Sequence, residues 1–150
     1  LIVSRGLGDV YKRQGKNVPK PDLKEVKNQI FALIDCIKSG LILSCHDISD
    51  GGIACALSEM TFKNQIGANI NIDSELREDQ ALFSETGGFL LEIKKSSLVK
   101  VRSTFSNYGL NIFKIGRTNN SNRLIINKCI NISLKKATQA WTNGLRDKLI

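Results

Sequence analysis

The sequence predicts an α/β fold in which helices pack on a mixed β-sheet. Segments with helical spacing alternate with short apolar or alternating segments typical of strands. Both short, hairpin-like connections and long, crossover-like connections occur. The expected order is α-β-α-β-(α)-β-α-β-β-β-α. The chain has 150 residues, 41% of them apolar and 24% charged, which is typical of one globular domain.

The first half predicts a helix, a strand and a second helix. Asp22 is the expected N-cap of the first helix, and Gly40 is expected to end it. The segment "LILSC" (41–45) is short and apolar, which predicts a buried strand. A second helix is expected over 52–62. The apolar positions that define the two helices are Val26, Ile30, Leu33, Ile34 and Ile37, and then Ile53, Ala56, Leu57 and Met60.

The second half predicts shorter elements. "ANINI" (68–72) reads as a half-exposed strand, "REDQALF" (77–83) as a helical turn, and "GFLLEI" (88–93) as a strand. A helix follows and is expected to stop at Tyr108-Gly109. "LNIFKI" (110–115) and "RLII" (123–126) are expected to be strands joined by the loop "GRTNNSN" (116–122). "CINI" (129–132) is a last strand, and Ser133 is the expected N-cap of a closing helix. The side chains expected on shared apolar faces are Phe89, Leu91 and Ile93; Leu98, Val101 and Phe105; and Leu134, Ala137, Trp141, Leu145 and Leu149.

The segment "SRGLGDVYKRQ" (4–14) has neither helical nor strand periodicity. It also looks like the translation of a sequencing adaptor. We therefore interpret residues 1–14 as a non-native segment, to be left out of fold reasoning, and expect them to be unpacked. The alternative is a flexible basic arm. Residues 15–21 are expected to form a linker, and residues 22–150 the folded domain.

Composition argues against several function classes. The net charge of +8 is spread along the chain and is not concentrated in arginine-rich, aromatic patches, so no nucleic-acid partner is expected. No apolar run is long enough for a membrane span. The cysteines show no metal-ligand spacing and predict buried free thiols in a reducing cytosol, hence a cytoplasmic protein without a metal site. They are Cys36, Cys45, Cys55 and Cys129.

The motif "SCHDISDGG" (44–52) contains the chain's one histidine and joins a predicted strand to a predicted helix. The first N–H groups of a helix attract anions, and glycines allow a phosphate to approach the backbone. Asp47 and Asp50 are suited to Mg²⁺ or to an amine or hydroxyl. The candidate phosphate- or nucleotide-cleft residues are therefore His46, Asp47, Asp50, Gly51 and Gly52. A purely structural alternative is that Asp50 caps the helix, the glycines form a tight turn, and His46 satisfies a buried carbonyl.

A second polar cluster, "LFSETGG" (82–88), also precedes a predicted strand. Ser84, Glu85 and Thr86 are candidates for reaching into a cleft, with two glycines giving clearance. The alternative is an ordinary turn stabilised by serine and threonine hydroxyls.

The two clusters together carry a resemblance to a known family. "HDISDGGIACALSEM", "GANINI" and "ALFSETGGFLLEI" occur in this order, followed by Ile115-Gly116 and a closing helix with Trp141. From about Gly15 to its end, the chain resembles the C-terminal domain of the synthetase subunit of phosphoribosylformylglycinamidine synthase. This family belongs to the aminoimidazole ribonucleotide synthetase superfamily. The histidine motif is shared more loosely with hydrogenase maturation proteins and selenophosphate synthetases.

The resemblance implies a fragment of an ATP-dependent C–N ligase of purine biosynthesis. The family converts formylglycinamide ribonucleotide, ATP and glutamine-derived ammonia to formylglycinamidine ribonucleotide, ADP and phosphate, with Mg²⁺ assisting phosphoryl transfer. Its partners would be the remaining synthetase domains, a glutaminase subunit and a small accessory subunit. The alternatives are a non-enzymatic anion-binding or interaction module, or another member of the same superfamily, such as a hydrogenase maturation protein or a selenophosphate synthetase.

The resemblance also limits what this chain can do alone. The family's catalytic histidines, and most of its ATP and Mg²⁺ ligands, lie in other domains, so His46 is not expected to be a catalytic base. In the family's first C-type domain a Glu-Ser-Gln stretch binds substrate; the residues here are Glu85, Thr86 and Gly87. Because two of these three differ, this domain is expected to line a degenerate nucleotide cleft or to brace the active one. The isolated chain is expected to be inactive.

Overall fold

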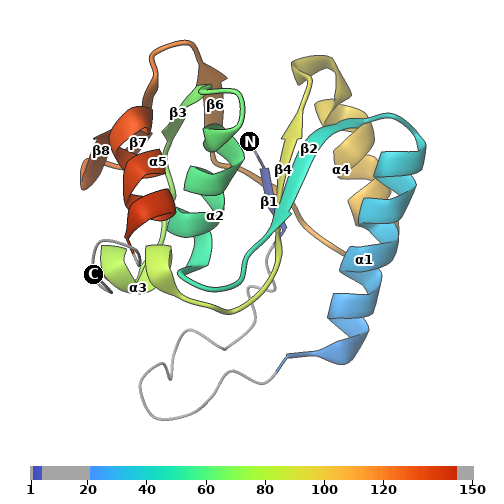
Figure 1. The fold of residues 1–150 in the computed structure, drawn as a ribbon. Coiled ribbons are helices and arrows are strands. Elements are labelled where there is room, and N and C mark those ends of the chain that lie inside the picture. The colour runs from blue at the N-terminus through green and yellow to red at the C-terminus, as the bar shows by residue number, and fades with distance from the viewer. Residues whose placement is uncertain (1, 5–20, 145–150) are drawn as a thin grey trace.

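A computed structural model describes residues 2–4 and 21–144 and arranges their strands in two four-stranded sheets (Figure 1). The first sheet has the order β2-β4-β1-β5, and its neighbouring strands are antiparallel. The second has the order β6-β3-β7-β8, with β3 and β7 parallel and the other pairs antiparallel. The strands are β1 (Ile2–Ser4), β2 (Ile42–Asp47), β3 (Gly67–Ile70), β4 (Phe89–Ile93), β5 (Phe113–Lys114), β6 (Gly116–Asn119), β7 (Arg123–Ile126) and β8 (Ile130–Ser133).

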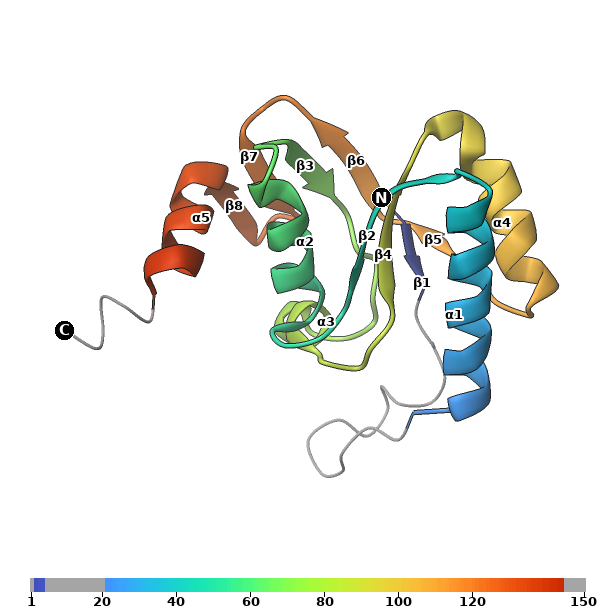
Figure 2. The same ribbon diagram turned by 45° about the vertical axis from the view of Figure 1, so that its right-hand side comes forward.

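Helices separate and cover these sheets (Figure 2). Helices α1 and α4 pack on the first sheet around Leu91 and Phe105, whereas α2 shares a second core with Leu90 of the first sheet and Leu124 of the other. The predicted α/β class is confirmed, with the strands divided between two sheets. The helices are α1 (Leu23–Lys38), α2 (Gly52–Phe62), α3 (Glu78–Phe83), the 3₁₀ turn η2 (Lys95–Ser97), α4 (Leu98–Asn107) and α5 (Leu134–Asn143). No helix in the described ranges is both long and apolar enough to cross a membrane.

Several predicted elements are confirmed with their capping residues. Asp22 accepts hydrogen bonds from the backbone N–H groups of Lys24 and Glu25 at the start of α1, and Ser133 accepts one from Lys136 at the start of α5. Helix α2 has the predicted bounds. In β4, Leu91 is buried in the core under α1 and α4, and Phe89 and Ile93 pack against the same core, as predicted. Leu145 and Leu149 lie outside the described residues.

The helical spacing correctly identified α1, but most of the apolar positions that define it do not face the core. Val26, Ile30, Ile34 and Ile37 are 37–50% exposed, and of the predicted apolar positions only Leu33 is buried. The face that packs on the sheet instead carries Gln29, Ala32, Leu33 and Cys36. Small residues on this face let α1 pack closely against α4 and the sheet, and the larger side chains are left on a neighbouring face.

The segment "LILSC" is not a buried strand. Strand β2 lies at the edge of its sheet and pairs only with β4, so one side of its backbone has no strand neighbour within the described residues. Leu43 is 55% exposed, and the pairing register shifts between Ile42 and Ser44. An irregular register at an edge strand is a common way to disturb further strand pairing.

The predicted loop over 116–122 is in part a strand. Gly116–Asn119 forms β6, which pairs antiparallel with β3, while β7 pairs with the other side of β3. The segments therefore do not form a hairpin with each other. Polar residues typical of turns are accommodated here because β6 is an edge strand whose middle residues, Arg117 and Thr118, are exposed.

The expectation that residues 1–14 are unpacked is wrong for Ile2–Ser4. This segment forms β1, which pairs antiparallel with β4 on one side and with β5 on the other. Backbone pairing needs no helical or alternating side-chain pattern, which explains why periodicity missed it. Residues 5–14, and the expected linker up to residue 20, lie outside the described residues. The non-native origin of residues 1–14 stays a prediction.

We predict that deleting residues 1–4 lowers the melting temperature. The deletion removes the strand between β4 and β5, so β4 keeps only β2 as a partner and β5 loses its link to the sheet. Thermal unfolding followed by circular dichroism, with the full 150-residue chain as control, measures the change. An unchanged melting temperature would show that β1 adds nothing to the stability of the sheet.

Candidate functional site

The histidine motif forms a tight turn between β2 and α2. Gly51 and Gly52 both have left-handed backbone conformations, with φ of 74° and 64°. Two successive residues of this kind suit glycine, which has no Cβ to clash with the backbone. Gly51 is the N-cap of α2 and the helix has no side-chain cap, so the alternative in which Asp50 caps it is wrong.

Gly52 also permits a close contact with a second segment. A Cβ atom built there would lie 2.7 Å from the carbonyl oxygen of Leu82 and 2.7 Å from the carbonyl carbon of Phe83. These residues end α3 and lead directly into Ser84, Glu85 and Thr86. The glycine therefore brings the start of α2 against the second polar cluster, and a larger residue would hold them apart.

The two predicted clusters are joined by hydrogen bonds. The backbone N–H of Gly51 donates to Oε1 of Glu85 over 2.9 Å, and the N–H of Ile48 donates to the carbonyl oxygen of Gly88 over 2.9 Å. Glu85 thus places a carboxylate at the positive end of α2. The structure brings together the two clusters that the sequence identified separately. An incoming phosphate would compete with Glu85 for the Gly51 N–H.

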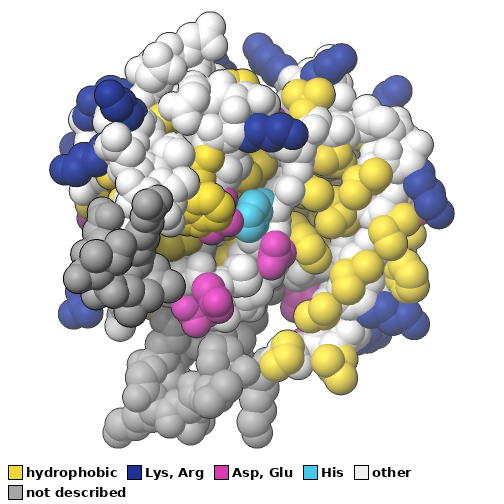
Figure 3. Space-filling view, in the orientation of Figure 1, with side chains coloured by type: hydrophobic (Ala, Val, Ile, Leu, Met, Phe, Trp, Pro, Cys, Tyr) yellow, Lys and Arg dark blue, Asp and Glu magenta, His cyan; other side chains and the backbone are white. Residues whose placement is uncertain are grey.

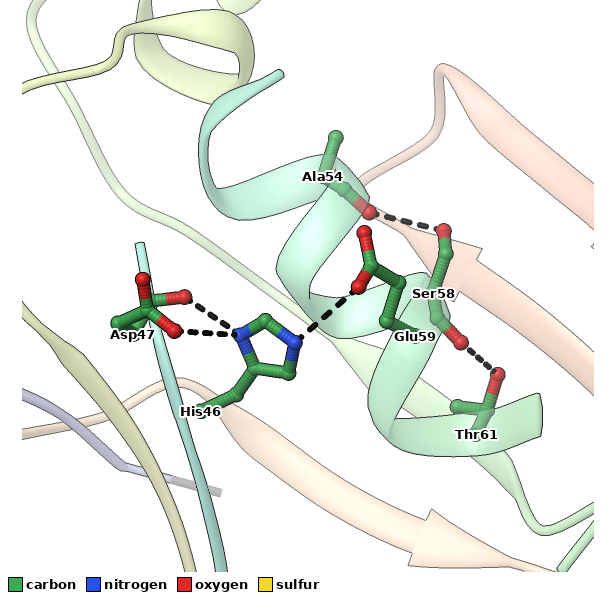
Figure 4. Close-up of polar contacts among 6 residues, drawn as sticks. All are labelled: His46, Asp47, Ala54, Ser58, Glu59 and Thr61. Atoms are coloured by element: carbon green, nitrogen blue, oxygen red, sulfur yellow. Dashed lines mark hydrogen bonds and ion pairs between the residues drawn. The ribbon is translucent and has the colours of Figure 1, made fainter. Parts of the chain in front are cut away.

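His46 links the edge strand β2 to α2 (Figure 4). Its Nε2 lies 3.2 Å from Oε2 of Glu59, and its Nδ1 lies 2.6 Å from the carbonyl oxygen and 3.5 Å from Oδ1 of Asp47. Both ring nitrogens face oxygen atoms, and only the doubly protonated ring donates to both. His46 contacts the carbonyl of the exposed Asp47, not a buried carbonyl as the structural alternative proposed. It also forms an ion-pair geometry with Glu59, which sequence reasoning missed. The spacing of 13 residues across a strand, a turn and a helix gave no signal for this pair.

The surroundings of the turn are acidic (Figure 3). Asp47, Asp50 and Glu85 are exposed, and Ser84 and Thr86 are half-buried. His46 lies on this face with acidic side chains around it (Figure 3). Among the described residues, no group of three or more histidine, cysteine or acidic side chains is arranged to hold a metal ion. These residues alone do not fit a complete site for Mg²⁺ or for a Mg²⁺-bound nucleotide.

The acidic side chains near the turn also affect the thiol of Cys55. Burial raises the pKa of its thiol, and the nearby Glu59 and Glu85 carboxylates raise the pKa further. The thiol is therefore mostly protonated at neutral pH and is a poor nucleophile. The prediction of buried free thiols holds for Cys36 but not for the other cysteines: Cys55 is half-buried, and Cys45 and Cys129 are exposed. All four are free.

Most of the chain matches one protein family. Residues 3–128 match the family model described as AIR synthase related protein, C-terminal domain. The chain belongs to this family. The match includes both polar clusters, most of β1 and every element from α1 to β7, and it ends before β8 and α5. The predicted family relationship is confirmed.

Similar proteins are much longer than this chain. It is 28% identical over 140 residues to the phosphoribosylformylglycinamidine synthase subunit PurL of Methanothrix thermoacetophila, which covers 90% of the chain and 18% of that protein. It is 36% identical over 135 residues to PurL of Thermoplasma acidophilum, covering 85% and 17%. The chain spans less than a fifth of either protein.

Solved structures share the fold. Thermotoga maritima PurL complexed with AMPPCP matches with a TM-score of 0.75 and 15% identity, covering 91% of this chain and 24% of that one. The structure of PurLQS from the same organism matches with a TM-score of 0.73 and 15% identity, covering 89% and 24%. At this identity the likeness establishes the fold.

We predict that Gly52→Ala destabilises the domain far more than Gly87→Ala. Both glycines have positive φ, but a Cβ at Gly87 meets nothing within 4 Å, whereas at Gly52 it meets backbone. The strain common to both substitutions is about 1 kcal/mol, and the collision should add about 2 kcal/mol or more at Gly52. Urea unfolding of the two variants measures the difference. Equal losses would mean that the close approach of α2 to Leu82 and Phe83 is not a constraint.

We predict that Glu85→Gln lowers the pKa of Cys55. Removing the negative charge favours the thiolate, so the alkylation rate of Cys55 at a fixed pH near 8 rises. Mass spectrometry of iodoacetamide-labelled peptides over a pH series measures this rate. Glu78→Gln is the matched control, because Glu78 raises the pKa of Cys129 and should change the profile of that cysteine alone. A Cys55 profile insensitive to Glu85→Gln would contradict the described cluster.

Proposed function

We propose that this chain is the C-terminal domain of a longer phosphoribosylformylglycinamidine synthase. The longer protein would be an ATP-dependent C–N ligase that converts formylglycinamide ribonucleotide, ATP and ammonia to formylglycinamidine ribonucleotide, ADP and phosphate. The observation that carries the proposal is the family match over residues 3–128, which contains both polar clusters. The coverage of less than a fifth of each PurL relative supports a role as one part of that enzyme.

Within such an enzyme, we assign the turn and the loop that follows α3 to one wall of a cleft. Of the candidate residues, His46 and Asp47 end β2, Asp50 and Gly51 lie in the turn, and Gly52 begins α2. Ser84, Glu85 and Thr86 form the adjoining loop, and the Gly51–Glu85 hydrogen bond holds turn and loop together. Because Glu85 already occupies one N–H at the start of α2, the wall is better suited to bracing or positioning than to binding a phosphate directly.

ATP and Mg²⁺ would be bound mainly by other domains of the longer protein. The acidic turn repels an uncompensated phosphate and offers no complete metal-ligand set within the described residues. When bound, Mg²⁺ would neutralise charge on the transferred phosphoryl group. The contribution of this chain is a rigid surface against which such a site can close.

The partners follow from the same proposal. The structure named PurLQS contains PurL in an assembly, and we propose that the longer protein works with a glutaminase subunit and a small accessory subunit. Nucleic acid and membrane are not among the proposed partners. A cytoplasmic location is proposed from the substrates and from the free cysteines.

We predict that the 150-residue chain alone has no synthase activity, whereas a polypeptide of PurL length containing it is active. In-line phosphoryl transfer requires ATP, Mg²⁺ and the acceptor to be positioned together, and the described residues form only one wall. The assay is ADP release with formylglycinamide ribonucleotide, ATP, Mg²⁺ and excess ammonium. Ammonium replaces the glutaminase.

Substrate-dependent turnover by the chain alone would place a complete active site within these residues and contradict the proposal. Inactivity of the longer polypeptide would favour the non-enzymatic module. In the same assay, Glu85→Gln is compared with Glu78→Gln, which leaves the Gly51 contact intact. A loss of kcat/KM confined to Glu85→Gln would support the proposed wall.

A further inference from the structure

Helix α1 carries an uncovered apolar face, which we call the α1 stripe. It consists of large side chains spaced at three or four residues, so they lie along one side of the helix. Their exposed fractions range from 37% to 77%. Soluble domains rarely leave so many neighbouring apolar side chains in water without a partner. The α1 stripe comprises Leu23, Val26, Ile30, Ile34 and Ile37, with Phe31 beside it.

The α1 stripe does not belong to the core of this domain, and α1 cannot rotate to bury it there. A neighbouring side of α1 is already packed, through Ala32, Leu33 and Cys36, against α4 and the first sheet. The Asn28 side chain donates to the carbonyl oxygen of Tyr108, and Tyr108 donates to Asp35, which fixes the rotation of α1 against α4. The helix therefore cannot turn its apolar stripe inward without breaking these contacts.

Basic residues border the stripe. The spacings of 3 and 11 residues place three exposed lysines along one flank of the helix. They are Lys24, Lys27 and Lys38. The ammonium of Lys27 lies 5.7 Å from the centroid of the Phe31 ring, which keeps this charge beside the apolar surface. A second copy of α1 packed antiparallel by two-fold symmetry would bring the same flank against itself, lysine against lysine. A partner with acidic residues at its rim fits better.

The stripe and the candidate site face the same side of the molecule. In Figure 3 the hydrophobic side chains along α1 and the histidine are both visible on one face, with acidic side chains between them. A domain that covered the α1 stripe would also approach the turn at His46. The PurL relatives are more than five times as long as this chain, so they contain a large amount of polypeptide that this chain lacks.

We propose that the α1 stripe is the docking surface for a neighbouring domain of the same longer polypeptide, one that presents an apolar patch with an acidic rim. The proposal rests on the proposed function only in taking the chain as part of a longer protein. Docking there would bury the exposed isoleucines, pair the lysine flank and position the second domain over the candidate site.

The test is hydroxyl-radical footprinting of the 150-residue chain and of a polypeptide of PurL length that contains it. Leu23 and Phe31 should be labelled in the chain and protected roughly fivefold or more in the longer polypeptide. Val99 on α4 is the internal control, because it is as exposed as Leu23 and lies outside the stripe. Its labelling should not change.

A paired variant separates docking from folding. In the longer polypeptide, Ile30→Glu combined with Ile34→Glu should restore labelling of Leu23, whereas Val99→Glu should not. In the 150-residue chain neither change should lower the melting temperature by more than a few degrees, because all three side chains are exposed. Equal labelling of the stripe in both proteins overturns the proposal. Protection that appears only as the concentration of the short chain rises assigns the stripe to a second copy and also overturns it.

The readout does not depend on catalysis. Protection of the stripe in a longer polypeptide without synthase activity supports docking and contradicts the proposed function alone. Synthase activity in a longer polypeptide with an unprotected stripe supports the proposed function and contradicts docking alone.

Discussion

The contact of Gly52 with the backbone of Leu82 and Phe83 is the constraint on which the candidate site depends. It fixes where α2 begins, and α2 packs against strands of both sheets and against α3 and α5. Ile53 and Leu57 follow directly and are completely buried in the core that the two sheets share. The same contact holds Glu85 within reach of the Gly51 N–H. A side chain at position 52 would therefore disturb the site and the shared core together.

Local structure was predictable where one residue type has one physical role. Asp22 and Ser133 cap helices because their side-chain oxygens accept hydrogen bonds from backbone N–H groups at the helix start. The apolar spacing from Ile53 to Met60 identified α2. Burial was not predictable in the same way. Apolar spacing in α1 indicates that a surface must be covered, but it does not say whether the covering residues belong to this chain. The spacing of Val26, Ile30 and Ile34 identified the helix, but these side chains are exposed in the structure.

The candidate site was predicted in its parts and not in its connections. Gly51-Gly52 and the 82–88 cluster were recognised from composition, yet the hydrogen bond between Glu85 and Gly51 spans 34 residues and depends on how α3 meets α2. Glu59 was missed because it lies mid-helix, where an acidic residue normally faces solvent. The strands β1 and β6 were not predicted for a related reason. They are held by backbone hydrogen bonds, which do not require a particular pattern of side chains.

The proposed docking would account for both the incomplete site and the exposed stripe. An anion-attracting helix start that is already neutralised by its own Glu85 needs another source of positive charge before it can face a phosphate. An apolar helix face of this size, bordered by lysines, usually marks a surface that another surface covers. Both features lie on one side of the molecule (Figure 3), and both are accounted for if a second body of the same protein closes over that side. Under the proposed docking, the acidic turn would meet a positively charged surface of the second domain, and the lysines of α1 would meet its acidic rim. On this view the domain has its own core but contributes only one side of an interface. That core fixes the positions of the turn and the α1 stripe, which the second domain must match.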